Sequence, residues 1–580
     1  MSTKAIISAV SVILVVGVAI GVVVGVHKSS DSSVSSEMKA VKSMCSPTSY
    51  QDLCVETLTK ATNDTTTSDP KELVMASIST VIDHVQIGIN MSASFFASYN
   101  NSEVPWTLQN CKTLYEDAMD NLQEILSVLK DSDLQKVTED APGLQDYLNM
   151  VIADAVTCSD EIDDFSGKRS IQSHAGNVTM VTDNALAILG ELSQILLAFG
   201  IKLNATAFQA EGNRKLLAEE AAVAAIEGFP SWFSNADRRL LGMPTKGDKD
   251  ANFTIAPVVA GATPHAVVAK DGSGKFKTLA EALDAYPAGH QGRYIVHVKA
   301  GVYKEWYTLT KEKINVFVYG DGPTKTIITN NISVPKNKVS TSKSATLAVE
   351  AAGFIAKDIA FENTAGPDAG QAVALRVKAQ RCAFFNIRTD GFQDTLYVHG
   401  GLQFYRDCVI TGTVDYIFGD SSTIIQNSRL IVRKGRLMNA VTAMGKVEKH
   451  ETTAIVLQNC TVEAEAAWDK LAVKSFLGRP WKNYATTIFM ESDIGDFINP
   501  EGYMPMAPGA ESTCYYGEYR NRGAGADTKQ RVRWPGFHVM QPVDAERYTV
   551  EKYLHKFAQP VPWVKSTGFP YIPGLAAAAA

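Results

Sequence analysis

The sequence predicts a mainly β right-handed parallel β-helix, preceded by an all-α four-helix bundle. Short β-rich runs recur from residue 255 onward, and Asn, Gly and Asp interrupt them about every 20 residues. Thr346, Gln371, Asp394 and Asp415 repeat this period, since they lie 25, 23 and 21 positions apart, and one solenoid coil takes roughly 20 to 25 residues. No long amphipathic helices alternate with these runs, which argues against a doubly wound sheet or a TIM barrel. A β-sandwich is the alternative.

Residues 1–28 are expected to be a targeting segment. Lys4 precedes an apolar run at residues 5–26, and His27 and Lys28 follow it. A helix of this length, at about 1.5 Å per residue, could span a hydrocarbon layer of roughly 30 Å. We expect a signal anchor, with a cleaved signal peptide as the alternative; either sends the chain into the secretory pathway. Glycosylation acceptors of the Asn-x-Ser/Thr type fit that compartment: Asn63, Asn90, Asn100, Asn177, Asn204, Asn252, Asn331 and Asn459.

Residues 40–212 are expected to form the helical bundle, with an extra N-terminal hairpin. Apolar residues recur every three or four positions at residues 108–129, 144–156 and 181–197. Pro142 with Gly143, Gly167 and Gly200 are expected to separate the helices.

Four of the eight cysteines lie in this helical half: Cys45, Cys54, Cys111 and Cys158. In an oxidising compartment the favoured pairing is Cys45 with Cys54 and Cys111 with Cys158, although four cysteines allow three connectivities. Two buried thiols at Cys45 and Cys54 are the alternative.

A linker at residues 213–250 joins the bundle to a β-rich domain at residues 255–575. It carries two dibasic pairs, Arg214–Lys215 and Arg238–Arg239, which are candidate processing sites. An uncleaved basic linker is the alternative. In the β-rich domain we expect strands at residues 294–298, 316–319, 326–328, 345–349, 354–361, 372–377 and 423–425.

Charge divides the chain in two. Residues 1–245 carry a balance of −14 and residues 246–580 a balance of +7. A basic half suits a polyanionic partner, and an acidic half could mask it; the alternative is that each half only carries its own solubility charge. No basic run has the spacing of a nucleic-acid motif, so DNA and RNA are not expected as partners.

Two tracts, residues 391–396 (GFQDTL) and 412–419 (GTVDYIFG), each place one aspartate among apolar residues. Asp394 and Asp415 lie 21 positions apart, so on neighbouring coils they would be about 4.8 Å from each other. Two carboxyls so close do not readily both ionise. One is expected to stay protonated while the other remains a nucleophile, which is a catalytic pair.

These tracts resemble the plant pectin methylesterases that carry an N-terminal inhibitor-like pro-region. The resemblance also covers residues 301–305 (GVYKE) and 477–481 (LGRPW), and it runs from about residue 267 to 575. The pro-region resemblance, from about residue 45 to 203, rests on the cysteines and on residues 111–115 (CKTLY). The dibasic pairs resemble the family's sites for subtilisin-like processing proteases.

The resemblance implies a role for each matching residue. Asp415 corresponds to the nucleophile, Asp394 to the proton donor and Gln393 to the transition-state stabiliser. Substrate contacts fall on Thr346, Gln371, Arg479 and Trp481. The implied reaction is removal of methyl esters from cell-wall pectin through an aspartyl acyl-enzyme, releasing methanol. Separate inhibitor proteins are a further implied class of partner, and the acidic bundle should cover the basic cleft until the linker is cleaved.

Among the departures from the family pattern, two concern Cys408 and Asp420. Cys408 lacks its usual partner because residue 428 is Ser, so the local disulfide should be absent. Asp420 stands where an amide is frequent and could raise the pKa of a neighbouring carboxyl. The pairing of Cys382, Cys460 and Cys514 is not indicated.

Other function classes remain as alternatives. A glycosidase would also place two carboxyls about 5 Å apart, and a pectin-binding or inhibitor-type protein would show little activity. No cofactor or metal is expected, because the histidines have no ligand spacing. Residues 272–275 (GSGK) resemble a phosphate loop, but Phe276 follows where Ser or Thr is needed, so they are expected to form a turn.

Overall fold

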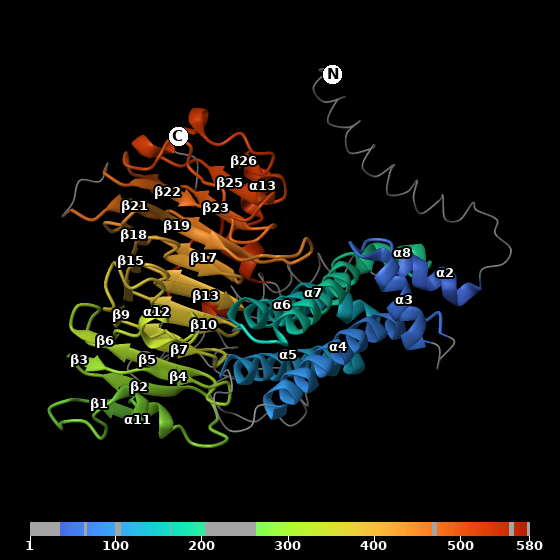
Figure 1. Ribbon diagram of the computed structural model, residues 1–580, viewed down its shortest axis with the longest axis horizontal. Helices are drawn as coiled ribbons and strands as arrows, with labels where there is room; N and C mark the ends of the chain where they lie inside the picture. Colours follow the sequence, from blue (N-terminus) through green and yellow to red (C-terminus); the bar gives the residue numbers. More distant parts are fainter. Residues whose placement is uncertain are drawn as a thin grey trace, which may run out of the picture.

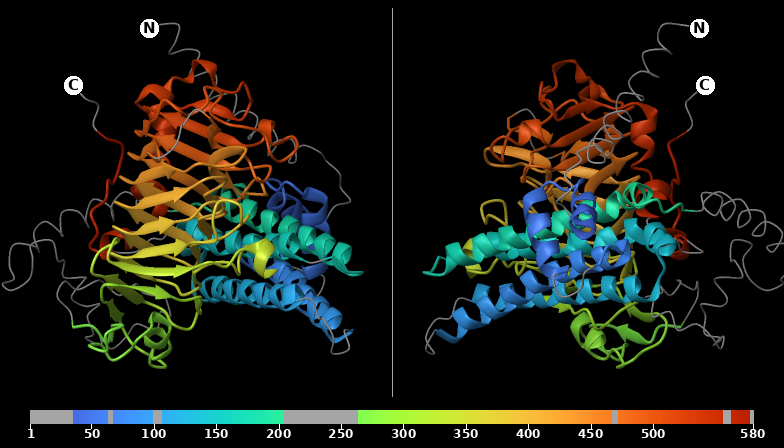
Figure 2. Two further views of the ribbon diagram at one scale, coloured as in Figure 1. Left: turned by 60° about the vertical axis from the view of Figure 1, so that its left-hand side comes forward. Right: turned by 90° about the vertical axis from the view of Figure 1, so that its right-hand side faces the viewer.

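The structure, a computed structural model, describes residues 35–62, 67–98, 106–162, 164–203, 263–466, 472–555 and 562–576. The apolar leader, both dibasic pairs and the acceptors Asn63, Asn100, Asn204 and Asn252 lie outside these ranges. The helical half and the β-rich half form two bodies that pack side by side (Figures 1 and 2).

The helical body is a four-helix bundle with a hairpin at its start, as expected. Its elements are α2 (Ser36–Met44), α3 (Gln51–Thr62), α4 (Pro70–Ser98), α5 (Trp106–Asp131), α6 (Leu134–Glu161), α7 (Lys168–Gly190) and α8 (Leu192–Ala198). The apolar stripe expected in α5 is fully buried at Leu122, Ile125 and Leu129, so its 3.6-residue period faces the bundle core.

Two expected helix boundaries are wrong. Pro142 lies inside α6, which starts at its cap Asp133 and continues to Glu161; tertiary burial of its apolar face outweighs the roughly 3 kcal/mol cost of an internal proline. The run at residues 181–197 is not one helix, because the chain bends by 67° between α7 and α8.

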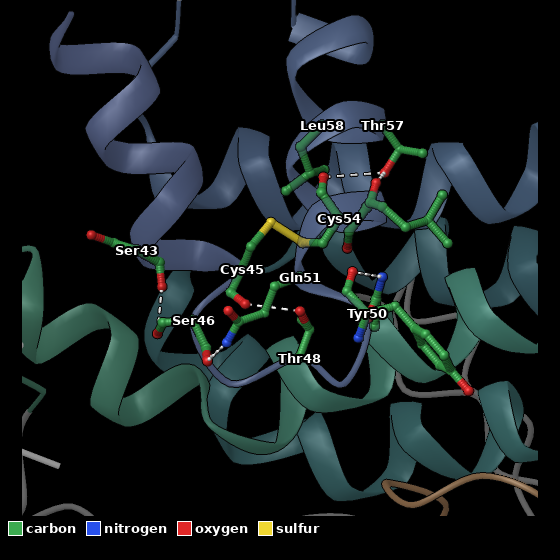
Figure 3. The surroundings of a disulfide bond; sticks show 12 residues. Ser43, Cys45, Ser46, Thr48, Tyr50, Gln51, Cys54, Thr57 and Leu58 are labelled. Atoms are coloured by element: carbon green, nitrogen blue, oxygen red, sulfur yellow. Dashed lines mark hydrogen bonds between the residues drawn. A yellow bond between two sulfur atoms is a disulfide. The ribbon is translucent and has the colours of Figure 1, made fainter. Parts of the chain in front are cut away.

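The favoured disulfide pairing is confirmed. Cys45 and Cys54 join α2 to α3, with their Cα atoms 5.7 Å apart (Figure 3). Cys111 and Cys158 join α5 to α6, with a Cα separation of 4.7 Å. The two-thiol alternative for Cys45 and Cys54 is therefore wrong.

The β-rich body is a stack of coils with three parallel sheets. The eleven-stranded sheet contains, in spatial order, β1 (Ala266–Val268), β2 (Tyr294–Val298), β5 (Val316–Gly320), β8 (Ile355–Lys357), β11 (Cys382–Phe385), β14 (Leu402–Arg406), β17 (Ser422–Gln426), β20 (Ala454–Gln458), β23 (Thr486–Met490), β25 (Tyr515–Tyr519) and β26 (Phe537–Val539). The eight-stranded sheet contains β24 (Asp493–Ile494), β21 (Thr461–Ala464), β18 (Arg429–Val432), β15 (Val409–Gly412), β12 (Arg388–Asp390), β9 (Ala360–Asn363), β6 (Thr326–Asn330) and β3 (Gly301–Lys304).

The third sheet, called the site sheet below, has seven strands. They are β22 (Lys474–Gly478), β19 (Met438–Met444), β16 (Ile417–Gly419), β13 (Leu396–Gly400), β10 (Leu375–Lys378), β7 (Leu347–Val349) and β4 (Tyr307–Leu309). This is a parallel β-helix, so the β-sandwich alternative is wrong. Short elements complete the body: α11 (Leu279–Asp284), α12 (Val334–Asn337), η2 (Ala510–Ser512), η3 (Ala524–Ala526), η4 (Thr528–Gln530), α13 (Pro542–Glu546), η5 (Val550–Leu554) and α14 (Trp563–Ser566).

Register converts the sequence period into columns of stacked residues. Leu347, Leu375, Leu396 and Ile417 lie opposite one another across the site sheet and point into the core. The run expected as a single strand at residues 354–361 is split into β8 and β9. The chain turns between them at Asp358, whose φ is 53°, and passes from one sheet to the next.

The remaining four cysteines, Cys382, Cys408, Cys460 and Cys514, are free and buried. The absence of a bond between Cys408 and residue 428 is confirmed: the Cys408 backbone N–H donates to Ser428 Oγ at 3.0 Å. A hydrogen bond to a serine hydroxyl therefore links the two coils at this position, in place of a disulfide.

Candidate active site

The two predicted acids lie on adjacent coils, each just before a strand of the site sheet. The Asp394 backbone N–H donates to the Val414 carbonyl at 3.1 Å, and Thr413 N–H donates to the Phe392 carbonyl at 2.8 Å. Asp394 and Asp415 both have positive φ, 61° and 52°, a conformation that Asp tolerates better than most residues. Such conformations are often found at functional sites.

Arg479 holds one of the two acids in a bidentate ion pair. It follows β22, and its Nε and Nη2 donate to the two carboxylate oxygens of Asp415 at 2.8 Å and 2.6 Å. Both aspartates are buried, at 7% exposure for Asp394 and 6% for Asp415. The guanidinium therefore fixes Asp415 and leaves Asp394 without an ion pair among the described residues.

Electrostatics separate the pKa values of the two acids. Burial raises the pKa of Asp394 well above its usual range, and the charge of Asp415 raises it further, against a smaller opposing effect of Arg479. Burial also raises the pKa of Asp415, but two hydrogen bonds and the charge of Arg479 oppose that rise. Asp394 is thus the group that holds a proton more strongly, and Asp415 the one that ionises first.

Gln393 directly precedes Asp394 on the same coil, and Gln371 and Thr346 lie on the two preceding coils. Ala372 N–H donates to the Gln393 carbonyl at 3.2 Å, which stacks the coil of Gln371 against that of Gln393. Both glutamines are half-buried. Thr346 is fully buried, and its hydroxyl donates to the Glu362 carbonyl at 2.8 Å, so its predicted substrate contact stays a prediction.

An aromatic floor extends outward from the two acids, and sequence reasoning found only part of it. The rings of Tyr397 and Phe418 stack with centroids 4.2 Å apart, and Trp481 lies 6.1 Å from Phe418. Together with small residues of the site sheet they form one apolar cluster. Tyr397 and Phe418 alternate with core residues in the strands after Asp394 and Asp415, so the two-residue period could have indicated them.

Asp420 has a buried carboxyl neighbour, Glu451, which the sequence did not indicate. Thr453 donates to Asp420 Oδ1 at 2.5 Å, and the backbone N–H groups of Val447 and Glu448 donate to Glu451 Oε1 at 2.9 Å and 2.7 Å. Burial, followed by the charge of Asp420, raises the pKa of Glu451 well above its usual range. The extra negative charge of Asp420 therefore acts on Glu451.

Helix α6 of the bundle lies across the outer face of the site sheet. Arg376 Nε donates to His399 Nδ1 at 2.9 Å, which leaves Nε2 as the protonated nitrogen, 2.7 Å from the Thr157 hydroxyl. Ser342 donates to Glu161 from its backbone N–H and its hydroxyl at 2.8 Å and 2.7 Å. The bundle thus covers the strand that follows Asp394.

No group of three or more metal-ligating side chains occurs in the described ranges.

Known proteins match both halves of the chain. A family model described as Pectinesterase matches residues 265–556, and one described as Plant invertase/pectin methylesterase inhibitor matches residues 39–188. Pectinesterase 5 of Arabidopsis thaliana is 36% identical over 615 residues, covering 99% of this chain and 100% of the relative. Probable pectinesterase/pectinesterase inhibitor 58 of the same plant is 37% identical, with coverage of 92% and 90%.

A solved structure matches the β-helix. Pectin methylesterase from carrot is 40% identical, with a TM-score of 0.53, and the match covers 55% of this chain and 100% of the carrot chain. The β-helix fold, the stacked acids and the two family models all indicate the same family. The chain therefore belongs to the pectinesterase family of carboxylic ester hydrolases, with an inhibitor-type helical domain ahead of the enzyme domain.

Proposed function

We propose that this chain removes methyl esters from homogalacturonan, releasing methanol and free carboxylates through an aspartyl acyl-enzyme. The observation that carries the proposal is the asymmetry of the two stacked acids. Arg479 pairs with Asp415 alone, while burial and the charge of Asp415 keep Asp394 protonated. One nucleophile and one acid side by side are what ester cleavage requires.

The first half-reaction transfers the acyl group. An Asp415 oxygen attacks the C6 carbonyl carbon, and negative charge develops on the carbonyl oxygen. The amides of Gln393 and Gln371 donate to that oxygen; the loss of one such donor typically costs about 3 kcal/mol of barrier. The bond to the methoxy group then breaks, and Asp394 gives its proton to the departing methanol.

The second half-reaction restores the enzyme. Asp394, now ionised, takes a proton from a water molecule, which attacks the carbonyl carbon of the acyl-enzyme. The bond to Asp415 breaks, and its carboxylate returns to Arg479. The product acid releases the other proton of the water molecule to solvent and leaves as a galacturonate carboxylate. Trp481 offers a flat face for a sugar ring beside the ester.

We also propose that the chain is a latent precursor until its linker is cut. The position of α6 over Tyr397 and His399 supports this, because a sugar chain on that floor would collide with the helix. A subtilisin-like protease would cut at Arg214–Lys215 or Arg238–Arg239 in the secretory route. Delivery to the cell wall and glycosylation belong to the same proposal; Asn90 and Asn177 are exposed acceptors on α4 and α7.

The test measures methanol and new reducing ends from esterified pectin, with linker-cut chain and with its Asp415→Ala variant. Methanol without reducing ends is expected from the parent, and neither product from Asp415→Ala. Reducing ends without methanol would indicate a glycosidase, and neither product from the parent, with pectin still bound, a binding protein. A chain with Lys215→Ala and Arg239→Ala that is uncut yet fully active would refute latency.

A further inference from the structure

The lysine ion pairs between the bundle and the β-helix all run in the same direction. Five of them join described residues of the two bodies, and in every one the carboxylate belongs to the bundle and the ammonium to the β-helix. Three lysines supply them: Lys311 binds Asp117 and Asp120, Lys378 binds Asp117 and Asp154, and Lys482 binds Asp160.

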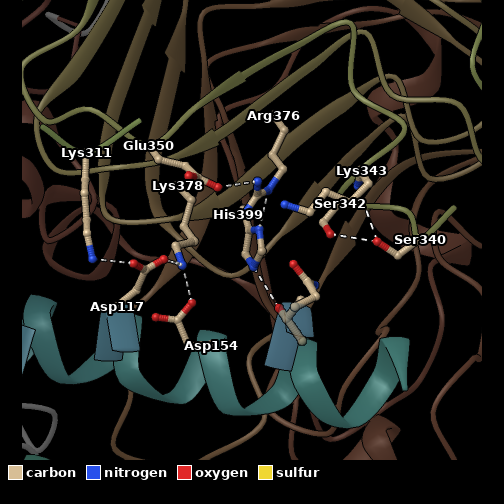
Figure 4. Close-up of polar contacts among 12 residues, drawn as sticks. Asp117, Asp154, Lys311, Ser340, Ser342, Lys343, Glu350, Arg376, Lys378 and His399 are labelled. Carbon is tan, nitrogen blue, oxygen red and sulfur yellow. Dashed lines mark hydrogen bonds and ion pairs between the residues drawn. The ribbon is translucent and has the colours of Figure 1, made fainter. Parts of the chain in front are cut away.

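Lys378 is the most enclosed of these cations. It extends outward from β10, is 4% exposed, and its Nζ lies 2.5 Å from Asp154 Oδ1 and 2.7 Å from Asp117 Oδ2 (Figure 4). The hydrogen bonds that its ammonium makes with described residues all go to the bundle. The β-helix therefore presents a charged group whose hydrogen-bond acceptors come from outside its own domain.

We infer that Lys311, Lys378 and Lys482 form a binding track for the free carboxylates of de-esterified galacturonan, which the acidic residues of the bundle occupy in the uncut chain. This inference rests on the proposed function, since it names a second class of sugar residue bound beside the ester at Asp415. The ligand is a polyuronide chain, recognised by its repeated carboxylates.

The placement of the three lysines along the stack supports the track. Lys311 follows β4, and Lys378 lies on β10, two strands further along the site sheet, or about 10 Å at the usual strand spacing. The backbone of Lys482 contacts Met444 at the end of β19, three strands beyond β10, or about 14 Å. The track runs along the axis of the stack, as an extended polymer would.

The track also adjoins the aromatic floor. The ammonium of Lys482 lies 5.4 Å from the ring centroid of Trp481. Between Lys482 and Lys378 lie Tyr397 and His399, whose rings stack with centroids 4.3 Å apart. A polymer whose ester reaches Asp415 would therefore bring its neighbouring residues over the lysines.

The pairing of Asp154 with Lys378 has the energetics of a displaceable contact. Asp154 is fully buried, and that burial raises its pKa to about 7 in spite of the adjacent ammonium. A carboxylate that is desolvated at this cost adds little net stability to an interface. A solvated polyanion offers the same lysines equivalent oxygens, so exchange of one anion for the other is feasible.

The consequence concerns release of the bundle. In the uncut or newly cut chain, de-esterified galacturonan would compete with the bundle for the lysines.

The experiment uses the whole chain with a single protease site placed in the linker, so that after cutting only the interface holds the bundle. Release of the bundle is measured by size-exclusion chromatography against oligogalacturonate, a fully methyl-esterified oligomer of equal length, and polyglutamate. Oligogalacturonate is expected to release the bundle at concentrations at least tenfold lower than either of the others. Equal effect of the esterified oligomer, or no release by any polymer, would overturn the inference.

Two variants locate the site on the β-helix. Lys311→Ala removes a cation at the rim of the track, where the side chain is 44% exposed. Lys313→Ala is the matched control, because Lys313 pairs with Asp284 of its own domain. With the bundle removed, retention on immobilised oligogalacturonate is expected to fall about tenfold for the first variant and to be unchanged for the second. Equal retention of both would refute the track.

Methanol release from the same samples separates this inference from the proposed function. Selective displacement by oligogalacturonate without methanol would remove the esterase proposal and leave a carboxylate-binding surface. Methanol release with no discrimination between charged and esterified oligomers would remove the track and leave the esterase.

Discussion

Replacing Arg479 by lysine tests the division of roles between the two acids. The guanidinium makes two parallel hydrogen bonds with Asp415, at 2.8 Å and 2.6 Å. A lysine ammonium keeps the charge but cannot reproduce this two-point contact. Loss of one charge-assisted hydrogen bond costs about 1.5 to 3 kcal/mol, which corresponds to a fall in kcat of about ten- to 150-fold.

The pH dependence of activity tests the same division of roles. Asp415 must be ionised to attack, so activity rises with pH through its pKa. Arg479 lowers that pKa against the effect of burial, so Arg479→Lys should move the acidic limb of the profile to higher pH. Asp394 must be protonated, and its pKa is raised chiefly by burial, so the alkaline limb should move far less.

The assay is the initial rate of methanol release from esterified pectin by linker-cut chain over a range of pH. Arg429→Lys is the matched control, because Arg429 pairs with Glu463 at 2.6 Å on the outside of the eight-stranded sheet. The control should keep the parent rate and profile. An Arg479→Lys variant with unchanged kcat and an unchanged acidic limb would refute the assignment of Asp415 as the nucleophile held by Arg479.

Three further predictions concern stability. Asp394→Asn should abolish methanol release yet raise the Tm at neutral pH. The pKa of Asp394 is higher in the folded than in the unfolded chain, so this acid lowers the stability of the fold as pH rises between the two pKa values. Tm curves of parent and variant that do not converge below about pH 3 would contradict this. Ser428→Cys should bond to Cys408 on the adjacent coil, with one fewer free thiol than the parent and stability higher by about 3 kcal/mol in denaturant unfolding; an unchanged thiol count would count against it. Replacing Cys111 and Cys158 by serine should lower the stability of the bundle by about 4 kcal/mol, seen as an earlier bundle transition by circular dichroism.

Local sequence patterns were enough to predict much of the fold. The runs at residues 294–298 and 316–319 coincide with β2 and β5 to within a residue, because short apolar strands broken by Asn and Gly leave few alternatives. The same reasoning failed at Pro142, where a local breaker was overridden by burial along α6. It also failed at Asp358, where a left-handed corner divides one apolar run between two sheets.

Site residues were predictable to the extent that they obey the coil period or match a family motif. Glu451 neither repeats with the coil period nor lies in a family motif. Its contact with Asp420 depends on how a loop between β19 and β20 folds back onto the stack. Tyr397 and Phe418 follow an alternation that the sequence contains, but only the outward face of the site sheet gives that alternation a function.

The sequence by itself determined that Asp394 and Asp415 meet, because in a stack of coils a separation of one period along the chain becomes a separation of one strand spacing in space. Only the tertiary structure decided what lies on top of them. Asp154 and Lys378 are 224 positions apart, and no period relates the surface of a helix bundle to the face of a sheet. Their contact follows from shape and charge complementarity between two bodies, which exist only once each has folded.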